Sequence, residues 1–537
     1  MRGHPVQRCP ENAESRMSNS NFIKKKPMAS DTQLSIVKAF LFELDAKKIR
    51  YCHFKSNEHL DAAVQGNTDL DLLFEESRKE EVVTALNKSG FVRYKAVALR
   101  EYPGIDDYLG IDSETGKLVH VHAHFRLLAG ETGVKSYHFP WEKEFLAKRQ
   151  WDEGCRIYRS AYSHEMVLLM IRAGLKQTHN DTLRSFLGLK DKGAKTQICR
   201  EYIWLRERVE KKELADSAKE LIGDEVVNPI NELYDRGFDK QSLTAFLESG
   251  KGYLSHCRRM GRAESIYRKI GVFSLKVFRY FRIFKFPKYR TTEGNGVIIA
   301  VLGPDGVGKS TQTRQISKTI ARKVDVLSLY MGSGKGRGSL ERFPLMVISN
   351  CGRRLGKLFR RIFRKEREGV KQARQGFRSR TIGQPYHLAW GLMLALERRK
   401  KLRRIAKAKA RGFIIVCDRY PQTEIMGYND GPLLATYRQS KIPGLRQLAE
   451  FEKSTYESAQ KIAPDIVLKL FCKIEVLAKR RPELDVSRIE MKQEGIRALR
   501  YSEKTIVFEI DASKGETEVF VEMMERVGHG IWQKQKA

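Results

Sequence analysis

Residues Val297–Leu302 (VIIAVL) run directly into Gly303-Pro-Asp-Gly-Val-Gly-Lys-Ser310, and TQTRQISKTI (311–320) follows. A short continuous apolar run of this kind is typical of a strand that is buried on both faces of a parallel sheet. The residues after Ser310 have the composition and spacing of a helix. The eight residues between strand and helix fit the pattern G-x-x-x-x-G-K-[ST] at every fixed position. The stretch therefore predicts a strand, a phosphate-binding loop and a helix, in that order.

The chemistry of this loop explains its spacing. Its glycines let backbone N–H groups turn toward phosphate oxygens, and the N-terminus of the following helix adds a favourable dipole. We expect Lys309 to reach the β- and γ-phosphates of ATP and the Ser310 hydroxyl to bind Mg²⁺. ATPases, GTPases and kinases all share this loop, so the motif alone does not choose among them. The predicted nucleotide-binding residues are Gly303, Asp305, Gly306, Val307, Gly308, Lys309, Ser310 and Thr311.

The C-terminal part of the chain repeats the same strand-and-helix alternation. FIIVC (413–417) and IVLKLF (466–471) are further buried-strand patterns, and helical stretches lie between them. Alternating β and α units imply an α/β domain with a doubly wound parallel sheet, which we place at residues 296–537.

Several segments of this domain resemble thymidylate kinases. They are GPDGVGKSTQ (303–312), the stretch 392–420 that ends in Asp418-Arg419-Tyr420, APDIVLKLFCKIEVLAKRR (463–481) and FEIDASKGETEVF (508–520). Together they cover residues 296–537 in the family's order. The resemblance implies a P-loop nucleoside-monophosphate kinase that transfers the γ-phosphoryl group of ATP, with Mg²⁺, to dTMP.

The resemblance also assigns roles to residues. Asp418 would help Ser310 hold Mg²⁺ and orient the acceptor, Arg419 would bind the monophosphate, and Arg398 would contact the acceptor base. Other interpretations are a helix cap for Asp418, a solvated helix face for Arg398, and surface charges for Arg480 and Arg481. By resemblance the catalytic residues are Asp305, Lys309, Asp418, Arg419 and Arg480, and the acceptor site is formed by Arg398, Arg419 and Tyr420.

Three differences from the family fall on the acceptor side. Leu302 stands where the family has Glu, VLSLYMGSGKGRGSL (326–340) replaces its Arg-Glu-Pro stretch, and Leu394 aligns with its base-stacking Phe. The insertion between Ser339 and Gln384 is long and basic. Another monophosphate or a phosphorylated sugar therefore remains open as the acceptor.

The N-terminal half has a different motif. HFKSNEHLDAAVQGNTDLDLLF (53–74) resembles the nucleotidyltransferase superfamily, with Ser56 in the turn and Asp69-Leu-Asp71 on the next strand. Alternation on a strand places both carboxylates on one face, where they could share a divalent metal. The third carboxylate of that family is missing from KLVHVHAHF (117–125), which offers His120, His122 and His124. These histidines are either metal ligands or outward residues of an edge strand. We predict an α+β nucleotidyltransferase-like domain at 31–160 and a helical domain at 161–275.

The remaining segments are basic or polar. Residues 1–30 read as a disordered leader without a signal peptide, and the eight cysteines are scattered, as expected for reduced thiols in the cytoplasm. The net charge is +35, and residues 353–411 hold 21 Lys and Arg against 3 Asp and Glu. The linker 276–295 and the amphipathic segment 353–380 could contact an anionic membrane, which would place the protein peripherally at the inner membrane face. The alternative is an amphipathic helix that packs on the kinase domain and keeps its charged face in water. No nucleic-acid fold signature is present, and a homodimer is left open.

Three hypotheses follow. The first is the thymidylate-kinase-like enzyme. The second is a kinase or nucleotidyltransferase that acts on another phosphorylated acceptor in envelope polysaccharide assembly. The third is a non-catalytic ATP-binding protein at the membrane periphery.

Overall fold

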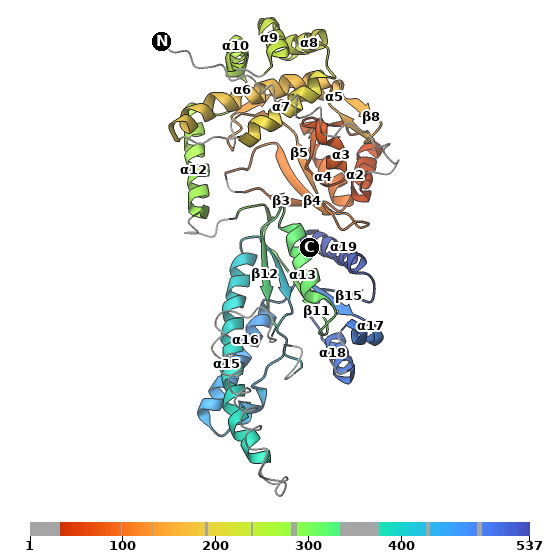
Figure 1. Cartoon of the computed structure of the whole chain (residues 1–537), viewed down its shortest axis with the longest axis vertical. Coiled ribbons are helices and arrows are strands. Elements are labelled where there is room, and N and C mark those ends of the chain that lie inside the picture. The colour runs from red at the N-terminus through yellow and green to blue at the C-terminus, as the bar shows by residue number, and fades with distance from the viewer. Residues whose placement is uncertain are drawn as a thin grey trace, which may run out of the picture. The chain divides into compact units, whose positions relative to one another are not determined.

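The computed structural model describes residues 33–97, 99–130, 133–187, 192–237, 240–280, 287–332, 375–425, 430–480 and 486–536. The chain divides into two compact units, residues 1–290 and 291–537, and both are α/β (Figure 1). The predicted leader 1–30 and most of the basic segment 353–380 lie outside the described residues. Within the described ranges, none of the helices combines the length and the apolar character needed to span a bilayer.

The C-terminal unit is built on a parallel sheet. Its strands are β11 (Val297–Leu302), β12 (Val326–Tyr330), β13 (Ile414–Asp418), β14 (Ile466–Phe471) and β15 (Ile506–Asp511). They pair in the order β12-β13-β11-β14-β15. From β11 the chain builds β12 and β13 on one side and then crosses to the other for β14 and β15. In open sheets of this kind, ligands bind beyond the carboxyl ends of the strands where the direction reverses, which here is at β11.

Helices cover both faces of this sheet. Their bounds are α13 (Lys309–Ile320), α15 (Gln375–Lys409), α16 (Pro443–Lys461), α17 (Ile474–Arg480), α18 (Val486–Ala498) and α19 (Glu516–Lys536). Ile298, Ala300 and Leu302 of β11 pack in one apolar cluster with residues of α15, α16 and α18. On the opposite face lie α13 and α19, joined by a hydrogen bond from Gln312 to the Glu516 carbonyl (Figure 1). Burial on both faces explains why β11 is apolar throughout.

The N-terminal unit contains a mixed sheet. Its strands in spatial order are β3 (Val92–Lys95), β4 (Ile105–Ile111), β5 (Leu118–His124), β2 (Leu70–Phe74), β1 (Tyr51–His53), β9 (Ile157–Arg159) and β8 (Gln150–Asp152). The pairs β2–β5 and β1–β9 are parallel, and the other pairs of this series are antiparallel. A separate hairpin joins β6 (Leu127–Ala129) to β7 (Tyr137–Phe139). The alternative of an edge strand for the three histidines is wrong, because β5 lies between β4 and β2.

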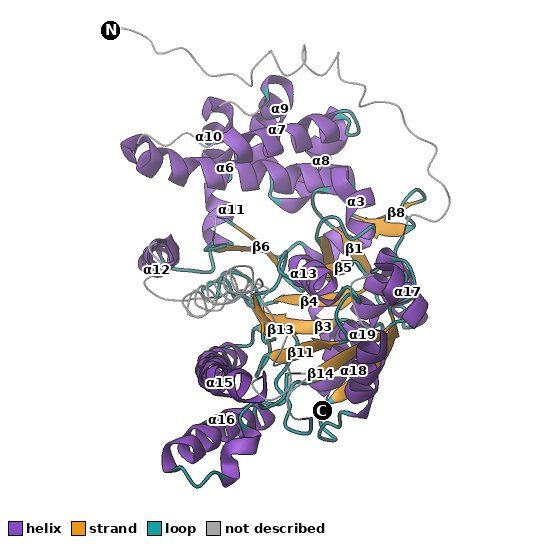
Figure 2. Ribbon diagram, turned by 60° about the horizontal axis from the view of Figure 1, so that its bottom comes forward, coloured by secondary structure: helices purple, strands orange, loops and turns teal. Residues whose placement is uncertain are grey.

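Two apolar cores hold this unit together. One face of the sheet packs against α2 (Ser35–Ala46), α3 (Leu60–Val64) and α4 (Lys79–Lys88). A second core joins α5 (Glu142–Ala147) to the helices that follow it. Figure 2 shows these helices as purple ribbons grouped around α6 and α7. They are α6 (Tyr162–Leu187), α7 (Lys192–Arg206), α8 (Lys211–Leu221), α9 (Val227–Arg236), α10 (Lys240–Ser249) and α11 (Lys251–His256). Helix α12 (Arg262–Tyr280) comes next in the chain. Helix α12 continues five residues into the stretch predicted as a linker, since its apolar residues keep helical spacing.

Candidate functional site

The loop after β11 has the backbone conformation that its glycines allow. Gly306 and Gly308 have φ values of 90° and 95°, in the left-handed region that side chains rarely adopt. A Cβ atom at Gly303 would lie 2.8 Å from the Leu470 carbonyl oxygen. Helix α13 begins at Lys309, directly after this turn. The first N–H groups of α13 therefore end at the loop, and an anion placed there would meet both the free donors and the helix dipole.

Lys309 is buried at this helix N-terminus, with 5% of its surface exposed. Its ammonium group donates a hydrogen bond to the Pro304 carbonyl within the loop. Burial, together with the nearby Arg419 guanidinium, lowers the pKa of Lys309 to about 7. An anionic phosphate at the loop would favour the charged form of this side chain, because opposite charges attract strongly where water is excluded.

Ser310 and Asp418 come together across two neighbouring strands. The pairing of Val301 with Asp418 places the end of β13 beside the start of the loop. There the Ser310 hydroxyl donates a hydrogen bond to Asp418 Oδ2. The other carboxylate oxygen, Oδ1, is buried without a hydrogen-bond partner in the described part of the chain. A hydroxyl beside a carboxylate with an unsatisfied oxygen is a donor set that suits Mg²⁺, which binds oxygen ligands.

Arg419 links the loop to a second acidic residue, Asp430. The φ angle of Arg419 is 70°, so the backbone turns sharply directly after β13. Its guanidinium donates to Asp305 of the loop and to Asp430 Oδ2, the latter at 3.3 Å. Lys492 of α18 donates to the second Asp305 oxygen at 2.7 Å. Burial alone would raise the pKa of Asp305, but Arg419 and Lys492 outweigh it and hold that pKa well below its ordinary value. The sequence interpretation missed Lys492 and Asp430, which no motif marks.

Arg398 of α15 is buried rather than solvated. Only 1% of its surface is exposed, so the alternative of a solvated helix face is wrong. Its guanidinium donates to the Tyr456 hydroxyl and lies 3.4 Å from Asp430 Oδ1 and from the Met331 carbonyl oxygen. Asp430 thus contacts both Arg398 and Arg419 and joins the two arginines of the predicted acceptor site.

Two other predicted residues lie apart from this cluster. The Tyr420 side chain is buried in the apolar core, where its hydroxyl donates to the Ile462 carbonyl at 2.5 Å. Exposed Arg480, at the end of α17, donates to the Ala512 carbonyl at 3.0 Å. Both side chains therefore make structural contacts here. Arg481 lies outside the described residues.

The N-terminal carboxylates meet histidines. Asp69 Oδ1 lies 2.8 Å from His120 Nδ1, and Asp71 Oδ1 lies 3.1 Å from His122 Nδ1. Asp107 of β4, which the sequence interpretation missed, lies 2.8 Å from His120 Nε2. It supplies a third carboxylate, but from a strand that precedes the histidines in the chain. The nucleotidyltransferase resemblance of this unit stays a prediction.

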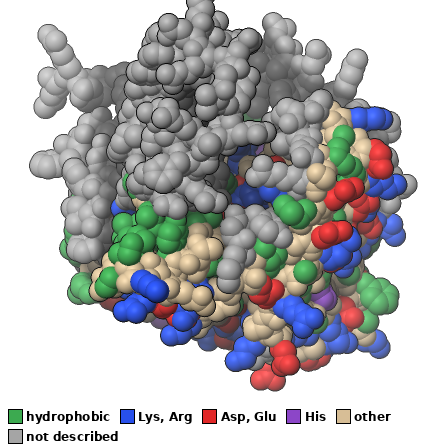
Figure 3. All heavy atoms as spheres, turned by 90° about the horizontal axis from the view of Figure 1, so that it is seen from below, with side chains coloured by type: hydrophobic (Ala, Val, Ile, Leu, Met, Phe, Trp, Pro, Cys, Tyr) green, Lys and Arg blue, Asp and Glu red, His purple; other side chains and the backbone are tan. Residues whose placement is uncertain are grey.

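Basic and acidic side chains are mixed on the described surface shown in Figure 3. In Figure 3, lysine and arginine side chains alternate with acidic ones over the coloured part of one face. The coloured part of this face therefore has no continuous patch of positive charge. The segment 353–374, which carries much of the basic charge, lies outside the described residues.

Comparisons with known proteins point to ATP binding. No family model matches the chain. It is 27% identical over 238 residues to the uncharacterized ATP-binding protein YghR of Escherichia coli K12, an alignment that covers 43% of this chain and 86% of YghR. It is 26% identical over 200 residues to the uncharacterized ATP-binding protein YghS of the same strain, covering 36% of this chain and 77% of YghS. The names of both relatives describe ATP-binding proteins, without a reaction or an acceptor.

Proposed function

We propose that the C-terminal unit binds ATP with Mg²⁺ and transfers its γ-phosphoryl group to a phosphorylated acceptor, with dTMP as the first candidate. The observation that carries the proposal is the contact of Ser310 with Asp418, close enough to Lys309 and Arg419 for their charges to interact, beyond the carboxyl ends of adjacent strands. The printed names of YghR and YghS support the ATP part of the proposal. The resemblance to thymidylate kinases supports the reaction type.

On the donor side, each residue has a defined task. The loop amides and the N-terminus of α13 hold the phosphate oxygens, and Lys309 offsets the charge on the β- and γ-phosphates. Ser310 and Asp418 would hold Mg²⁺, which would offset the negative charge that develops on the phosphates. Phosphoryl transfer depends mainly on positioning and on stabilisation of charge on oxygens. Cations and a metal site around one loop therefore meet the needs of this reaction.

On the acceptor side, Arg419 would bind the acceptor phosphate. An oxygen of that phosphate attacks the γ-phosphorus while the bond to the β–γ bridging oxygen breaks, and ADP leaves with the bonding electrons. Arg419 now contacts Asp305 and Asp430. A phosphate dianion would compete with these carboxylates for the guanidinium, which can bind it in a bidentate manner. Asp305 would then retain Lys492 as its partner.

The test is a coupled assay of ADP release with Mg-ATP and a panel of acceptors, namely dTMP, dUMP, UMP, CMP and sugar phosphates. Stimulation by dTMP alone is expected for a thymidylate kinase. Stimulation by another panel member would support a kinase whose acceptor has changed, as the altered residues at Leu302 and Leu394 allow. ADP release that no acceptor increases would contradict the kinase proposal and favour the ATP-binding protein without an acceptor.

The role of the loop lysine can be tested in the same assay with a variant that lacks it. Lys309→Ala is expected to lower kcat by about 100-fold or more, since a positioned cation at the transferring group is lost. Circular dichroism would verify that the variant is folded. Full activity in a folded Lys309→Ala variant would show that the loop is not where transfer occurs.

A further inference from the structure

A row of acidic and histidine side chains crosses the N-terminal sheet. In the parallel pair β2–β5, Asp71 lies opposite His122, and in the antiparallel pair β4–β5, His122 lies opposite Asp107. Alternate residues of β5, namely Val119, Val121 and Ala123, point to the apolar core on the other face. Because side chains alternate along a strand, His120, His122 and His124 all lie on the face that carries Asp71.

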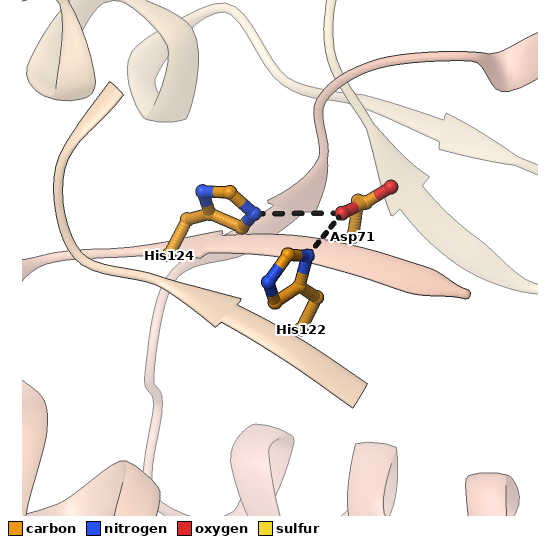
Figure 4. A group of neighbouring side chains, drawn as sticks. All are labelled: Asp71, His122 and His124. Atoms are coloured by element: carbon orange, nitrogen blue, oxygen red, sulfur yellow. Dashed lines mark hydrogen bonds and ion pairs between the residues drawn. The ribbon is translucent and has the colours of Figure 1, made fainter. Parts of the chain in front are cut away.

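Three of these side chains are spaced as metal ligands are. Figure 4 shows the His122 and His124 rings turned toward the same oxygen of Asp71. Asp71 Oδ1 lies 3.1 Å from His122 Nδ1 and 3.4 Å from His124 Nε2. One ligand atom from each residue lies within 4.8 Å of the other two. Bonds of about 2.1 Å to one cation place neighbouring ligands about 3.0–3.4 Å apart in octahedral or tetrahedral geometry, so both Asp–His distances suit a shared ion.

His124 provides an independent indication of a ligand. It is 1% exposed, its Nδ1 has no partner within the residues that the structure describes, and its Nε2 has only the 3.4 Å ion-pair contact with Asp71 Oδ1, which does not have hydrogen-bond geometry. The rings of Phe54 and His122 pack against it edge-on, each with its centroid 4.7 Å away. A buried polar ring whose nitrogens lack good hydrogen bonds is costly. A cation bound at Nε2 would satisfy the nitrogen that faces Asp71.

The surroundings of His122 also match those of a metal ligand. While Nδ1 faces Asp71, the second nitrogen, Nε2, lies 3.4 Å from Asp107 Oδ1. Metal-bound histidines usually have a carboxylate or carbonyl at the other ring nitrogen, which fixes the ring and its tautomer. Asp107 is therefore placed as the orienting partner of His122. His120 lies between Asp69 and Asp107 and would support these carboxylates without binding the ion.

We propose that Asp71, His122 and His124 bind one divalent transition-metal cation, of the class of Zn²⁺, Mn²⁺, Fe²⁺ or Co²⁺. Two imidazoles and one carboxylate favour this class over Mg²⁺ and Ca²⁺, which prefer an all-oxygen set. Three protein ligands leave coordination positions open for water or an anionic oxygen of a substrate. This site lies within the N-terminal unit and does not depend on the phosphate-binding loop of the other unit.

Lys55 is the competitor of the metal in this site. Its ammonium group lies 2.9 Å from Asp71 Oδ1, the oxygen that both histidines face. A bound dication would displace this ammonium group, because two cations cannot share one carboxylate oxygen at close range without repulsion. Removal of the Lys55 charge should therefore strengthen metal binding, whereas removal of an anion or an imidazole should weaken it.

The experiment is a titration of the full chain with Co²⁺, in the presence of excess Mg²⁺ to occupy the phosphate-binding loop. We expect one Co²⁺ per chain that Zn²⁺ displaces, with visible d–d bands and without a thiolate-to-cobalt charge-transfer band in the near ultraviolet. Asp71→Asn, His122→Ala and His124→Ala should each weaken binding by about 10–100-fold. Lys55→Met should bind more tightly. The matched control is His138→Ala, because His138 lies on β7 and contacts Glu142 instead.

Two further readouts keep the result unambiguous. Circular dichroism and thermal unfolding of each variant show whether weaker binding comes from loss of the site or from loss of the fold. Asp71→Asn preserves the size of the side chain, so it is the variant least expected to disturb the fold. Unchanged affinity in both folded histidine variants would overturn the proposal. So would an equal loss in His138→Ala, or a charge-transfer band that assigns the ion to cysteine.

Discussion

The Ser310 hydroxyl donates a hydrogen bond to Asp418 Oδ2, although 108 positions separate the two residues in the chain. The parallel pairing of β11 with β13 brings them together, because Val301 and Asp418 are partners in that register. The other Asp418 oxygen is buried and makes no hydrogen bond among the described residues. This pair therefore forms the part of the C-terminal site at which Mg²⁺ binding can be tested directly.

Asp418→Asn is expected to raise the Mg²⁺ concentration needed for half-maximal phosphoryl transfer by at least about tenfold. The amide keeps the size of the side chain but removes the charge that binds a hard cation. The measurement is the rate of ADP release as a function of free Mg²⁺. Glu509→Gln is the control, since it removes an exposed carboxylate from β15 of the same sheet. Equal Mg²⁺ curves for Asp418→Asn and the unmodified protein would contradict the assignment.

The affinity for Mg-ATP should fall as the pH rises above about 7. Burial lowers the pKa of Lys309 to about 7, with Arg419 adding repulsion and Asp305, Asp418 and Asp430 opposing the shift. Bound phosphates favour the protonated amine, so the pKa of Lys309 is higher in the complex than in the free protein. Between these two values, binding takes up a proton, and affinity decreases by up to about tenfold per pH unit.

Calorimetric titrations in buffers of different ionisation enthalpy would count the protons taken up. In Lys309→Arg the guanidinium stays charged at every accessible pH. The Lys309→Arg variant should therefore lose the decrease in Mg-ATP affinity above about pH 7, even if its affinity is lower at every pH. If the affinity for Mg-ATP fell equally with pH in Lys309→Arg and in the unmodified protein, another group would be responsible.

Arg398→Ala should destabilise the C-terminal unit by about 3–5 kcal/mol. The substitution leaves Asp430 buried without one of its two arginine partners, and loss of one member of a buried pair is costly. Arg399 follows it on the same helix but is exposed, so Arg399→Ala should change stability by no more than about 0.5 kcal/mol. The unfolding transition of this unit can be identified as the one that Mg-ATP shifts to higher temperature. Similar shifts for the two variants would contradict the structural role of Arg398.

Asp69→Ala should leave ATP-dependent phosphoryl transfer unchanged. Asp69 belongs to the compact unit 1–290, and the phosphate-binding loop belongs to the unit 291–537. The comparison is between kcat and KM for the acceptor in the variant and in the unmodified protein. Loss of kinase activity in a folded Asp69→Ala variant would show that the two units depend on each other for catalysis.

Much of the backbone could be predicted from the sequence. The apolar runs 297–302 and 466–471 became β11 and β14 with the same bounds, because strands buried on both faces leave a continuous apolar signal. The pattern 413–417 differs by one residue from β13, which ends at Asp418. The segment 161–275, predicted to be helical, contains several separate helices, α6 to α12. Helical periodicity identifies the element type better than it identifies where one helix stops and the next begins.

The partners of the site residues could not be predicted in the same way. Asp430 and Lys492 lie in no recognisable motif, yet they pair with Arg419 and Asp305. Asp107 was not identified because it precedes the histidine strand in the chain, whereas the resemblance directed attention to a later strand. Burial of Arg398 was also hidden, since the surrounding helix is rich in charged residues.

The sequence by itself determined the loop from Gly303 to Ser310, because glycine spacing, lysine and serine act within one turn and need only local geometry. It also determined which strands are apolar on both faces and that Asp69 and Asp71 share a face. Only the tertiary structure decided which distant side chains meet: Asp418 with Ser310, and Asp71 with His122 and His124. Strand order and register fix these meetings, and they arise from the packing of the whole sheet, which no local stretch of sequence specifies.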